Sequence, residues 1–287
     1  MNNARIVSKK EIESVAPEKK RWFTFSRKQL CIPYGLFLAM FVVFPLLLIL
    51  YYAFTNGTGS FTFQNFINFF SNTTAISTLL ISIIVSFAVT IICLLIAYPV
   101  AYILSKMKGS VAFIFLLLFI TPTWINFVLR AMAMKEIFVL LNIPLGSFAN
   151  IVGLTYDFLP FMILPLYSTL IKMDRSLEEA ALDLGASKPR VFMSVTLPLS
   201  MPGIISGAMM VFLPVMSCYV VTDTFRGSSG FSVIGKLVAK CFLGESGAPI
   251  NINEGAAIAM IMLIIMVITM FLTGGFSREN SGRGTNL

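Results

Sequence analysis

The sequence predicts an all-α polytopic membrane protein, and three observations support this prediction. Of the 287 residues, 57% are hydrophobic and only 12% are charged, whereas soluble domains carry about 25% charged residues. Residues 29–105 contain no Asp, Glu, Lys or Arg, which leaves room for two membrane helices of about 20 residues each and a loop. Four further apolar runs follow, so we expect six spans.

Polar and turn-forming residues separate these runs. The segment 55–74 divides the first two runs, Lys106 and Lys108 precede the third, and Arg130 ends it. Residues 135–149 are apolar but too short to span, and predict a short helix at the membrane surface. We place the six spans at 33–54, 76–104, 110–130, 150–171, 203–222 and 255–276.

The fifth span begins with Gly203-Ile204-Ile205-Ser206-Gly207. Two glycines four residues apart lie on one face of a helix and let another helix backbone approach closely. We therefore expect a tight helix contact at this point.

The distribution of Lys and Arg predicts the orientation. With six spans, one side of the membrane carries 16 basic residues and the other carries 5, and the richer side is expected to be cytoplasmic. Residues 1–30 are then a basic cytoplasmic tail suited to anionic lipid, 31–277 the membrane domain, and 278–287 a second cytoplasmic tail. The net charge of +8 follows from this topology and gives no indication of nucleic-acid binding.

Several kinds of catalytic site are excluded by composition. The chain has no histidine, which rules out Ser/His/Asp catalysis and histidine zinc sites. The four cysteines lack metal-ligand spacing, so we expect no metal site. The run from Gly230 to Gly235-Lys236 imitates a P-loop, but Leu237 stands where a magnesium-binding Ser or Thr belongs. We therefore expect no cofactor in this chain.

The longest polar stretch within the membrane domain is 172–202. Ser176 and Glu179 have the spacing of a capping box, Gly185 is expected to end the helix, and Ser187 to cap a second helix with Pro189 in its first turn. On pattern alone, this could be an amphipathic hairpin resting on the bilayer.

The residues of this loop also resemble the EAA loop of ABC-importer permeases. Glu179-Ala180-Ala181, then Gly185, Val195 and Leu197-Pro198 match EAA-x3-G-x9-I-x-L-P, with Val195 in place of Ile. The resemblance implies a type I ABC importer permease fold with a cytoplasmic coupling helix that docks on a separate ATPase. The residues implied in that docking are Glu178, Glu179, Ala180, Ala181, Gly185, Ala186 and Ser187.

The runs 159–168 and 122–130 further resemble spermidine/putrescine permeases of the PotB type. That resemblance implies a non-enzymatic permease subunit in the bacterial inner membrane. The implied partners are a dimer of ATPase subunits that bind ATP and magnesium, a second permease subunit, and an extracytoplasmic substrate-binding protein.

Acidic residues near the outer ends of the spans agree with a cationic substrate. A charged side chain inside the membrane costs free energy and indicates function by default. Carboxylates would pair with the ammonium groups of a polyamine, and aromatic rings would cover its methylenes. The candidates for the substrate pathway are Trp124, Tyr156, Asp157, Tyr219, Asp223 and Glu254, although each acid could instead be a water-exposed residue at a helix end.

Two alternatives stay open at this stage. The chain could be a stand-alone channel or secondary transporter in which the acids couple ions, or an ABC permease for another small solute. A membrane-bound enzyme is disfavoured because the chain lacks histidine and clustered metal ligands.

Overall fold

The computed structural model describes residues 31–227, 230–244 and 250–283, with the backbone alone at 31–32 and 272–283. It divides into two compact units, residues 1–48 and 49–287. The predicted basic tail 1–30 lies outside the described residues. Of the predicted C-terminal tail, residues 278–283 belong to the last helix and the remainder lies outside the description.

The described part of the first unit is helical and apolar. It contains α2 (Cys31–Leu38), the π-helical η2 (Ala39–Val43) and the first half of α3 (Phe44–Ala53). The helix from Pro33 to Ala53 is long and apolar enough to cross a membrane. The side chains of residues 33–48 are exposed, which is stable only where the surrounding solvent is lipid.

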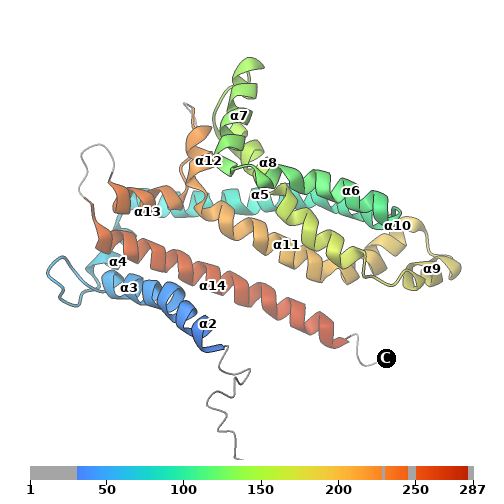
Figure 1. Cartoon of the computed structure of the whole chain (residues 1–287), viewed down its shortest axis with the longest axis horizontal. Helices are drawn as coiled ribbons and strands as arrows, with labels where there is room; N and C mark the ends of the chain where they lie inside the picture. Colours follow the sequence, from blue (N-terminus) through green and yellow to red (C-terminus); the bar gives the residue numbers. More distant parts are fainter. Residues whose placement is uncertain (1–30, 228–229, 245–249, 284–287) are drawn as a thin grey trace, which may run out of the picture. The chain divides into compact units, whose positions relative to one another are not determined.

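The second unit holds the remaining helices. In chain order they are α4 (Gln64–Ser71), α5 (Thr73–Lys106), α6 (Gly109–Ile120), η3 (Thr121–Trp124), α7 (Phe127–Leu140), α8 (Ser147–Leu170), α9 (Ser176–Asp183), α10 (Lys188–Val191), η4 (Phe192–Thr196), α11 (Leu197–Ser217), α12 (Tyr219–Thr224), α13 (Ile234–Leu243) and α14 (Ile252–Arg283). Helices α5, α8 and α11 pack against one another. Helices α9 and α10 lie at one end of this group, and α7, α12 and α13 lie at the other (Figure 1).

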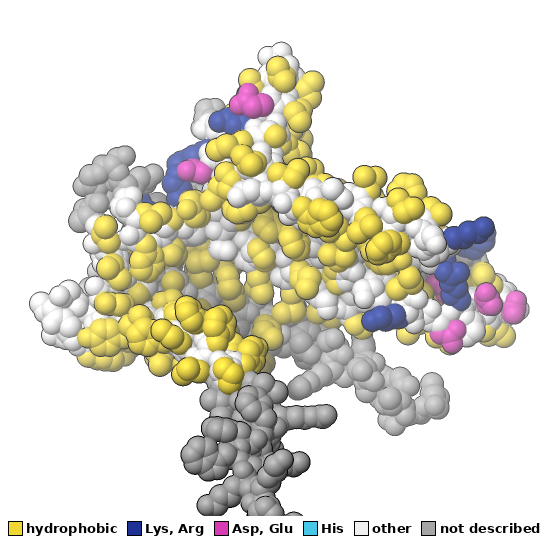
Figure 2. All heavy atoms as spheres, in the orientation of Figure 1, with side chains coloured by type: hydrophobic (Ala, Val, Ile, Leu, Met, Phe, Trp, Pro, Cys, Tyr) yellow, Lys and Arg dark blue, Asp and Glu magenta, His cyan; other side chains and the backbone are white. Residues whose placement is uncertain are grey.

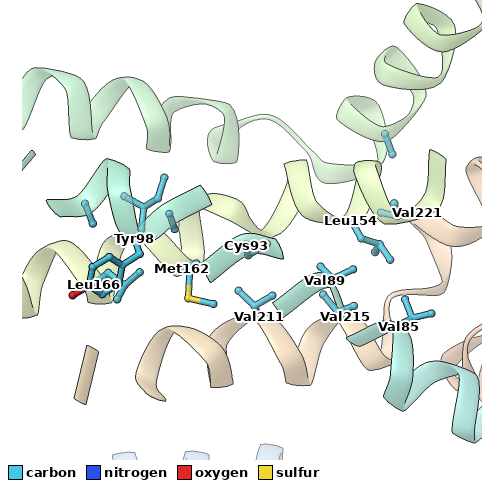
Figure 3. Packing of buried hydrophobic residues seen from close by; sticks show 14 of the residues in the cluster. Val85, Val89, Cys93, Tyr98, Leu154, Met162, Leu166, Val211, Val215 and Val221 are labelled. Atoms are coloured by element: carbon cyan, nitrogen blue, oxygen red, sulfur yellow. The ribbon is translucent and has the colours of Figure 1, made fainter. Parts of the chain in front are cut away.

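Polar side chains on the buried face of α5 are satisfied within the helix itself. The hydroxyls of Thr78, Ser82, Ser86 and Thr90 each donate to the carbonyl four residues earlier, at 2.7 to 2.8 Å. Such bonds allow small polar residues to be buried between helices without an orphaned donor. The apolar residues beside them, such as Val89 and Cys93, form the core with α8 and α11 (Figure 3).

The predicted close contact at the glycine pair is confirmed. A Cβ atom at Gly203 would lie 2.6 Å from Oγ1 of Thr169, and one at Gly207 would lie 2.6 Å from the sulfur of Met162. Both partners belong to α8, so the two glycines let α8 and α11 approach more closely than larger residues would allow.

Among the described residues, five helices are long and apolar enough to span a membrane, and the predicted third span is instead a bent pair of helices. We expected a straight third span over 110–130. Instead, α6 and η3 end at Trp124, and α7 leaves at 95° to them. Pro122 occupies the η3 turn, and Asn126 caps α7 by accepting from the backbone N–H of Val128 at 2.9 Å. The short helix predicted over 135–149 corresponds to α7, which begins eight residues earlier than expected.

The fifth span also differs from the prediction of 203–222. Its helix starts at Lys188, passes through the π-helical η4 and ends at Ser217. Pro198 and Pro202 lie in this helix, and the wider π-helical turn before Pro198 makes room for the proline ring. The predicted loop 172–202 is therefore shorter, because its last fifteen residues are helical.

Charged side chains gather at the two ends of the second unit. In the space-filling view they lie over α9 and α10 at one end and around α7 and α12 at the other, with apolar side chains between (Figure 2). This separation is what a membrane-spanning bundle requires, because only its ends meet water and lipid headgroups.

Candidate functional site

Helix α9 is the predicted short helix of the EAA-like loop. It ends at Asp183, and Gly185, the residue after the Leu184 cap, has a φ of +84° in the left-handed region that favours glycine. The backbone N–H of Gly185 donates to the Leu182 carbonyl at 2.9 Å, and that of Ala186 donates to Ala181 at 3.1 Å. Pro189 lies in the first turn of α10. The predicted helix, turn and second helix are confirmed. Ser187 occupies the cap position of α10 as predicted, but its side chain makes no capping hydrogen bond.

The predicted capping box is wrong. Ser176 is the first helical residue rather than the cap, and Arg175 at the cap position makes no side-chain capping bond. The acceptor at the start of this helix is instead Asp174, one residue before Arg175. Its Oδ1 accepts from the backbone N–H of Ser176 at 2.9 Å. This hydrogen bond lowers the pKa of the Asp174 carboxyl.

Glu178 ties α9 to two other helices. Its carboxylate pairs with the ammonium of Lys106 at the end of α5 and accepts from the hydroxyl of Thr196 at 2.8 Å, in the π-helical η4. Arg175 adds a hydrogen bond of 2.6 Å to the Ser105 carbonyl. We call Lys106, Arg175, Glu178 and Thr196 the coupling cluster.

The coupling cluster holds Glu178 in its charged form. Burial by itself would raise the pKa of this carboxyl, but the hydrogen bonds from Lys106 and Thr196, with the charges of Lys106 and Arg175, outweigh burial and hold the pKa below its usual range. Glu178 also lies in the first turn of α9, where the helix dipole favours an acid. Glu178 is therefore a buried support for α9.

The other residues of the motif lie on the outer surface of α9 and its turn. Glu179, Ala180, Gly185 and Ser187 are exposed, and Ala181 and Ala186 are half-buried. Leu184, a large apolar side chain between Asp183 and Gly185, is 89% exposed. A short helix with an exposed leucine, fixed from behind by a buried carboxylate, is suited to docking on another protein.

A buried ion pair lies toward the opposite end of the second unit. Nη2 of Arg130 on α7 is 3.2 Å from Oδ1 of Asp157 on α8, and the two side chains are only 6% and 3% exposed. The guanidinium also lies over the ring of Tyr156, 5.9 Å from its centre. Arg130, which was not predicted as a site residue, thus contacts both Tyr156 and Asp157, two consecutive residues of the predicted pathway.

A cavity of about 540 Å³ opens beside this pair. Trp124, 78% exposed, lines it. Its other lining residues include Asn126, Phe158, Phe161, Ser217 and Cys218, together with Arg130 and Asp157. The cavity therefore combines aromatic faces with one acid and one base, and it falls in the size range of small-molecule pockets, about 300 to 1,000 Å³.

The other predicted pathway acids lie elsewhere. Asp223 pairs with Lys236 and lies 3.8 Å from Arg226. It lines two other cavities, of about 440 and 130 Å³, together with the predicted pathway residue Tyr219. Glu254, at the start of α14, accepts from the Asn251 side chain at 2.9 Å. The structure thus separates Asp157, Asp223 and Glu254 into three surroundings, and only Asp157 lies in the cavity with Trp124.

The P-loop-like run has a structural role. A Cβ at Gly235 would lie 2.1 Å from the Ser217 carbonyl, so this glycine lets α13 pack against the end of α11. Lys236 pairs with Asp223. Helix α13 lies at the end of the second unit away from α9 (Figure 1).

The sequence reasoning missed the bases of both sites, Lys106 and Arg130. Each was taken only as the boundary of an apolar run. The signal that could have found Arg130 is its setting, because an arginine within a largely apolar segment needs a buried partner, and Asp157 is the one acid in the following span.

The relatives of this chain are permease proteins. No family model matches the sequence. The chain is 35% identical over 259 residues to the spermidine/putrescine transport system permease protein PotB of Haemophilus influenzae, covering 82% of this chain and 88% of that protein. It is also 35% identical over 196 residues to PotB of Escherichia coli K12, covering 62% and 69% of the two chains.

Solved structures show the same fold. This chain resembles a bacterial ABC transporter involved in the import of the acidic polysaccharide alginate, with a TM-score of 0.66 at 14% identity over 88% of this chain and 94% of that one. The same transporter in complex with its alginate-bound periplasmic protein gives a TM-score of 0.65. The chain therefore belongs to the PotB family of spermidine/putrescine transport system permease proteins and has the fold of an ABC importer permease.

Proposed function

We propose that this chain forms half of the translocation pathway of an ATP-driven importer of polyamines. The observation that carries the proposal is the support of α9 by Glu178, in a chain 35% identical to PotB over most of its length. A helix anchored to both α5 and α11 can transmit a push from an ATPase to the helices that line the cavity. The chain itself performs no catalysis.

The arrangement of basic residues supports the proposed orientation. Lys106, Lys172, Lys188 and Arg190 are all near α9 in the chain or in the coupling cluster, and basic residues favour the cytoplasmic side. We infer that α9 and both termini are cytoplasmic in the bacterial inner membrane, where ATPase subunits holding ATP and magnesium would meet the exposed Leu184.

Two further partners follow from the same proposal. Trp124 lies at the mouth of the cavity and is exposed in the isolated chain. A second permease subunit would enclose this side, and a substrate-binding protein would deliver the polyamine to the outer end. Membrane lipid would cover the remaining apolar surface.

A polyamine fits the chemistry of the cavity better than a neutral solute does. Aromatic rings attract cations and cover methylenes, and the carboxylate of Asp157 offers an ion-pairing partner within the cavity. An ABC permease for another solute, or a transporter acting alone, would not need both features together with a supported docking helix.

The test is uptake by a defined system. The chain would be reconstituted into proteoliposomes with its neighbouring ATPase, second permease and binding protein, and labelled spermidine and putrescine would be supplied outside. We expect uptake that requires ATP and every partner. Uptake without the ATPase would favour the stand-alone transporter, and no uptake of either polyamine by the complete, ATP-hydrolysing system would refute the proposed substrate class.

A further inference from the structure

Burying the Arg130–Asp157 pair costs the protein free energy. Both side chains are more than nine-tenths buried, and removing two charges from water is compensated only when good geometry and further hydrogen bonds satisfy both groups. Here they do not. Within the described part of the chain, Nε and Nη1 of Arg130 and both carboxylate oxygens of Asp157 have no hydrogen-bond partner.

The pair also joins two elements that are not otherwise continuous. Arg130 is on α7, beyond the 95° bend that follows η3, whereas Asp157 is in the middle of α8. The ion pair is thus a contact between the bent segment and the core helices. Its carboxylate faces the cavity that Trp124 also lines.

The guanidinium has a second favourable site within reach. It already lies over the ring of Tyr156, which attracts cations through its face. A modest movement of the Arg130 side chain toward this ring would release the carboxylate without leaving the arginine unsupported.

We propose that Asp157 binds an ammonium group of the polyamine and that Arg130 is its resting counter-ion, replaced by the substrate during transport. This inference rests on the proposed function and adds to it the exchange of Arg130 for a substrate ammonium group at Asp157. An ammonium carries three donors and can satisfy the carboxylate oxygens that Arg130 leaves unbonded. Because one cation replaces another, Asp157 is never an unpaired charge inside the membrane, and Tyr156 acts as a positioning residue for the displaced guanidinium.

The exchange predicts an asymmetry between the two partners. Asp157→Asn removes the carboxylate, so the KM for spermidine should rise at least about tenfold, the equivalent of about 1.4 kcal/mol. Arg130→Gln removes the competitor and keeps the carboxylate, so uptake should persist with a lower KM. A pair that only holds α7 to α8 would instead be damaged equally by either substitution.

The double variant Arg130→Gln with Asp157→Asn separates the two explanations. Its neutral side chains can hydrogen-bond to each other, so a purely structural pair would regain normal uptake. Under the exchange, the double variant keeps the high KM of Asp157→Asn. Both kinetic constants would be measured in the reconstituted importer, with complex assembly checked for each variant, and Asp183→Asn on α9 as a control acid outside the cavity.

The outcomes are distinct. Failure of the unsubstituted importer to take up any polyamine would refute the proposed function. Polyamine uptake by the unsubstituted importer, combined with recovery of the normal KM in the double variant, would overturn the exchange while leaving the function intact.

Discussion

Glu178 and Asp157 are the two acids buried among the described residues of this chain, and each is paired with a base. Glu178 accepts from Lys106 and Thr196 and stands near Arg175. Asp157 has only the 3.2 Å approach of Arg130, and neither of its oxygens accepts a hydrogen bond within the described residues. The Glu178 carboxylate therefore has several hydrogen-bond donors, whereas the Asp157 carboxylate has a single ion-pair partner.

This difference corresponds to what each end of the bundle must do. Under the proposed function, the coupling cluster transmits movement from α9 to α5 and α11. That role calls for a rigid connection, and multiple hydrogen bonds to one charge provide it. A substrate site must exchange partners during every transport cycle. A carboxylate satisfied by several fixed donors would release none of them easily, so an incompletely bonded pair is better suited to turnover.

The largest expected effect comes from the turn that presents α9. Gly185→Val forces a β-branched residue into left-handed backbone, which costs about 1 to 2 kcal/mol even for an ordinary residue, although nothing crowds a Cβ at this position. We expect the protein to reach the membrane while ATPase association weakens and uptake is lost.

Gly185→Asn is the matched control, because asparagine tolerates this conformation. Gly185→Asn should retain most of the uptake. Normal uptake by Gly185→Val would refute the role of α9 in coupling. Pull-down of the ATPase with the membrane complex measures association directly.

A smaller effect is expected when the coupling cluster itself is weakened. Glu178→Gln keeps the shape and the hydrogen bond to Thr196 but removes the charge facing Lys106. Hydrogen bonds to charged groups contribute about 1.5 to 3 kcal/mol, and the lower end applies because Lys106 is one-third exposed. Uptake should fall about tenfold, while the ATPase still binds and its hydrolysis becomes less dependent on substrate.

Asp183→Asn serves as control on the same helix, since Asp183 is exposed and outside the cluster. If Glu178→Gln and Asp183→Asn reduced uptake equally, the overall negative charge of α9 would matter, and not the buried contacts of Glu178. Substrate-stimulated hydrolysis and uptake should be measured on the same preparations.

The sequence allowed the class of fold and the coupling loop to be predicted because both depend on local signals. Long apolar runs determine the spans, and Gly185 determines a turn through its own backbone freedom. The errors arose where a local signal was overridden. The polar stretch 172–202 was predicted as a loop, but its residues from Lys188 on are helical. The third span bends at Pro122 and Asn126 although its composition is continuous.

The two ion pairs could not be predicted with certainty from local pattern. Lys106 and Glu178 are 72 residues apart, and their meeting depends on how α5, α9 and α11 pack. Asp157 was predicted as a pathway residue from the cost of burying an acid, but that argument favoured Asp223 and also named Glu254. Only the packing distinguishes the buried Asp157 from these two more exposed acids.

The smallest effects are expected at Asp223, which sharpens the contrast with Asp157. Asp223 is 44% exposed and shares its charge with Lys236 and Arg226, and exposed pairs contribute only about 0.2 to 1 kcal/mol. Asp223→Asn should therefore raise the KM for spermidine by at most about fivefold. Lys236→Ala leaves Asp223 more available to a cation and should lower this KM.

Both shifts in KM should shrink at high salt because exposed charges are screened, whereas the shift caused by Asp157→Asn should persist. Initial rates of uptake at two ionic strengths measure this, and ATP hydrolysis by the Lys236→Ala importer should be unchanged because α13 lies away from α9. An effect of Asp223→Asn as large and as salt-resistant as that of Asp157→Asn would place the principal cation site at Asp223 instead.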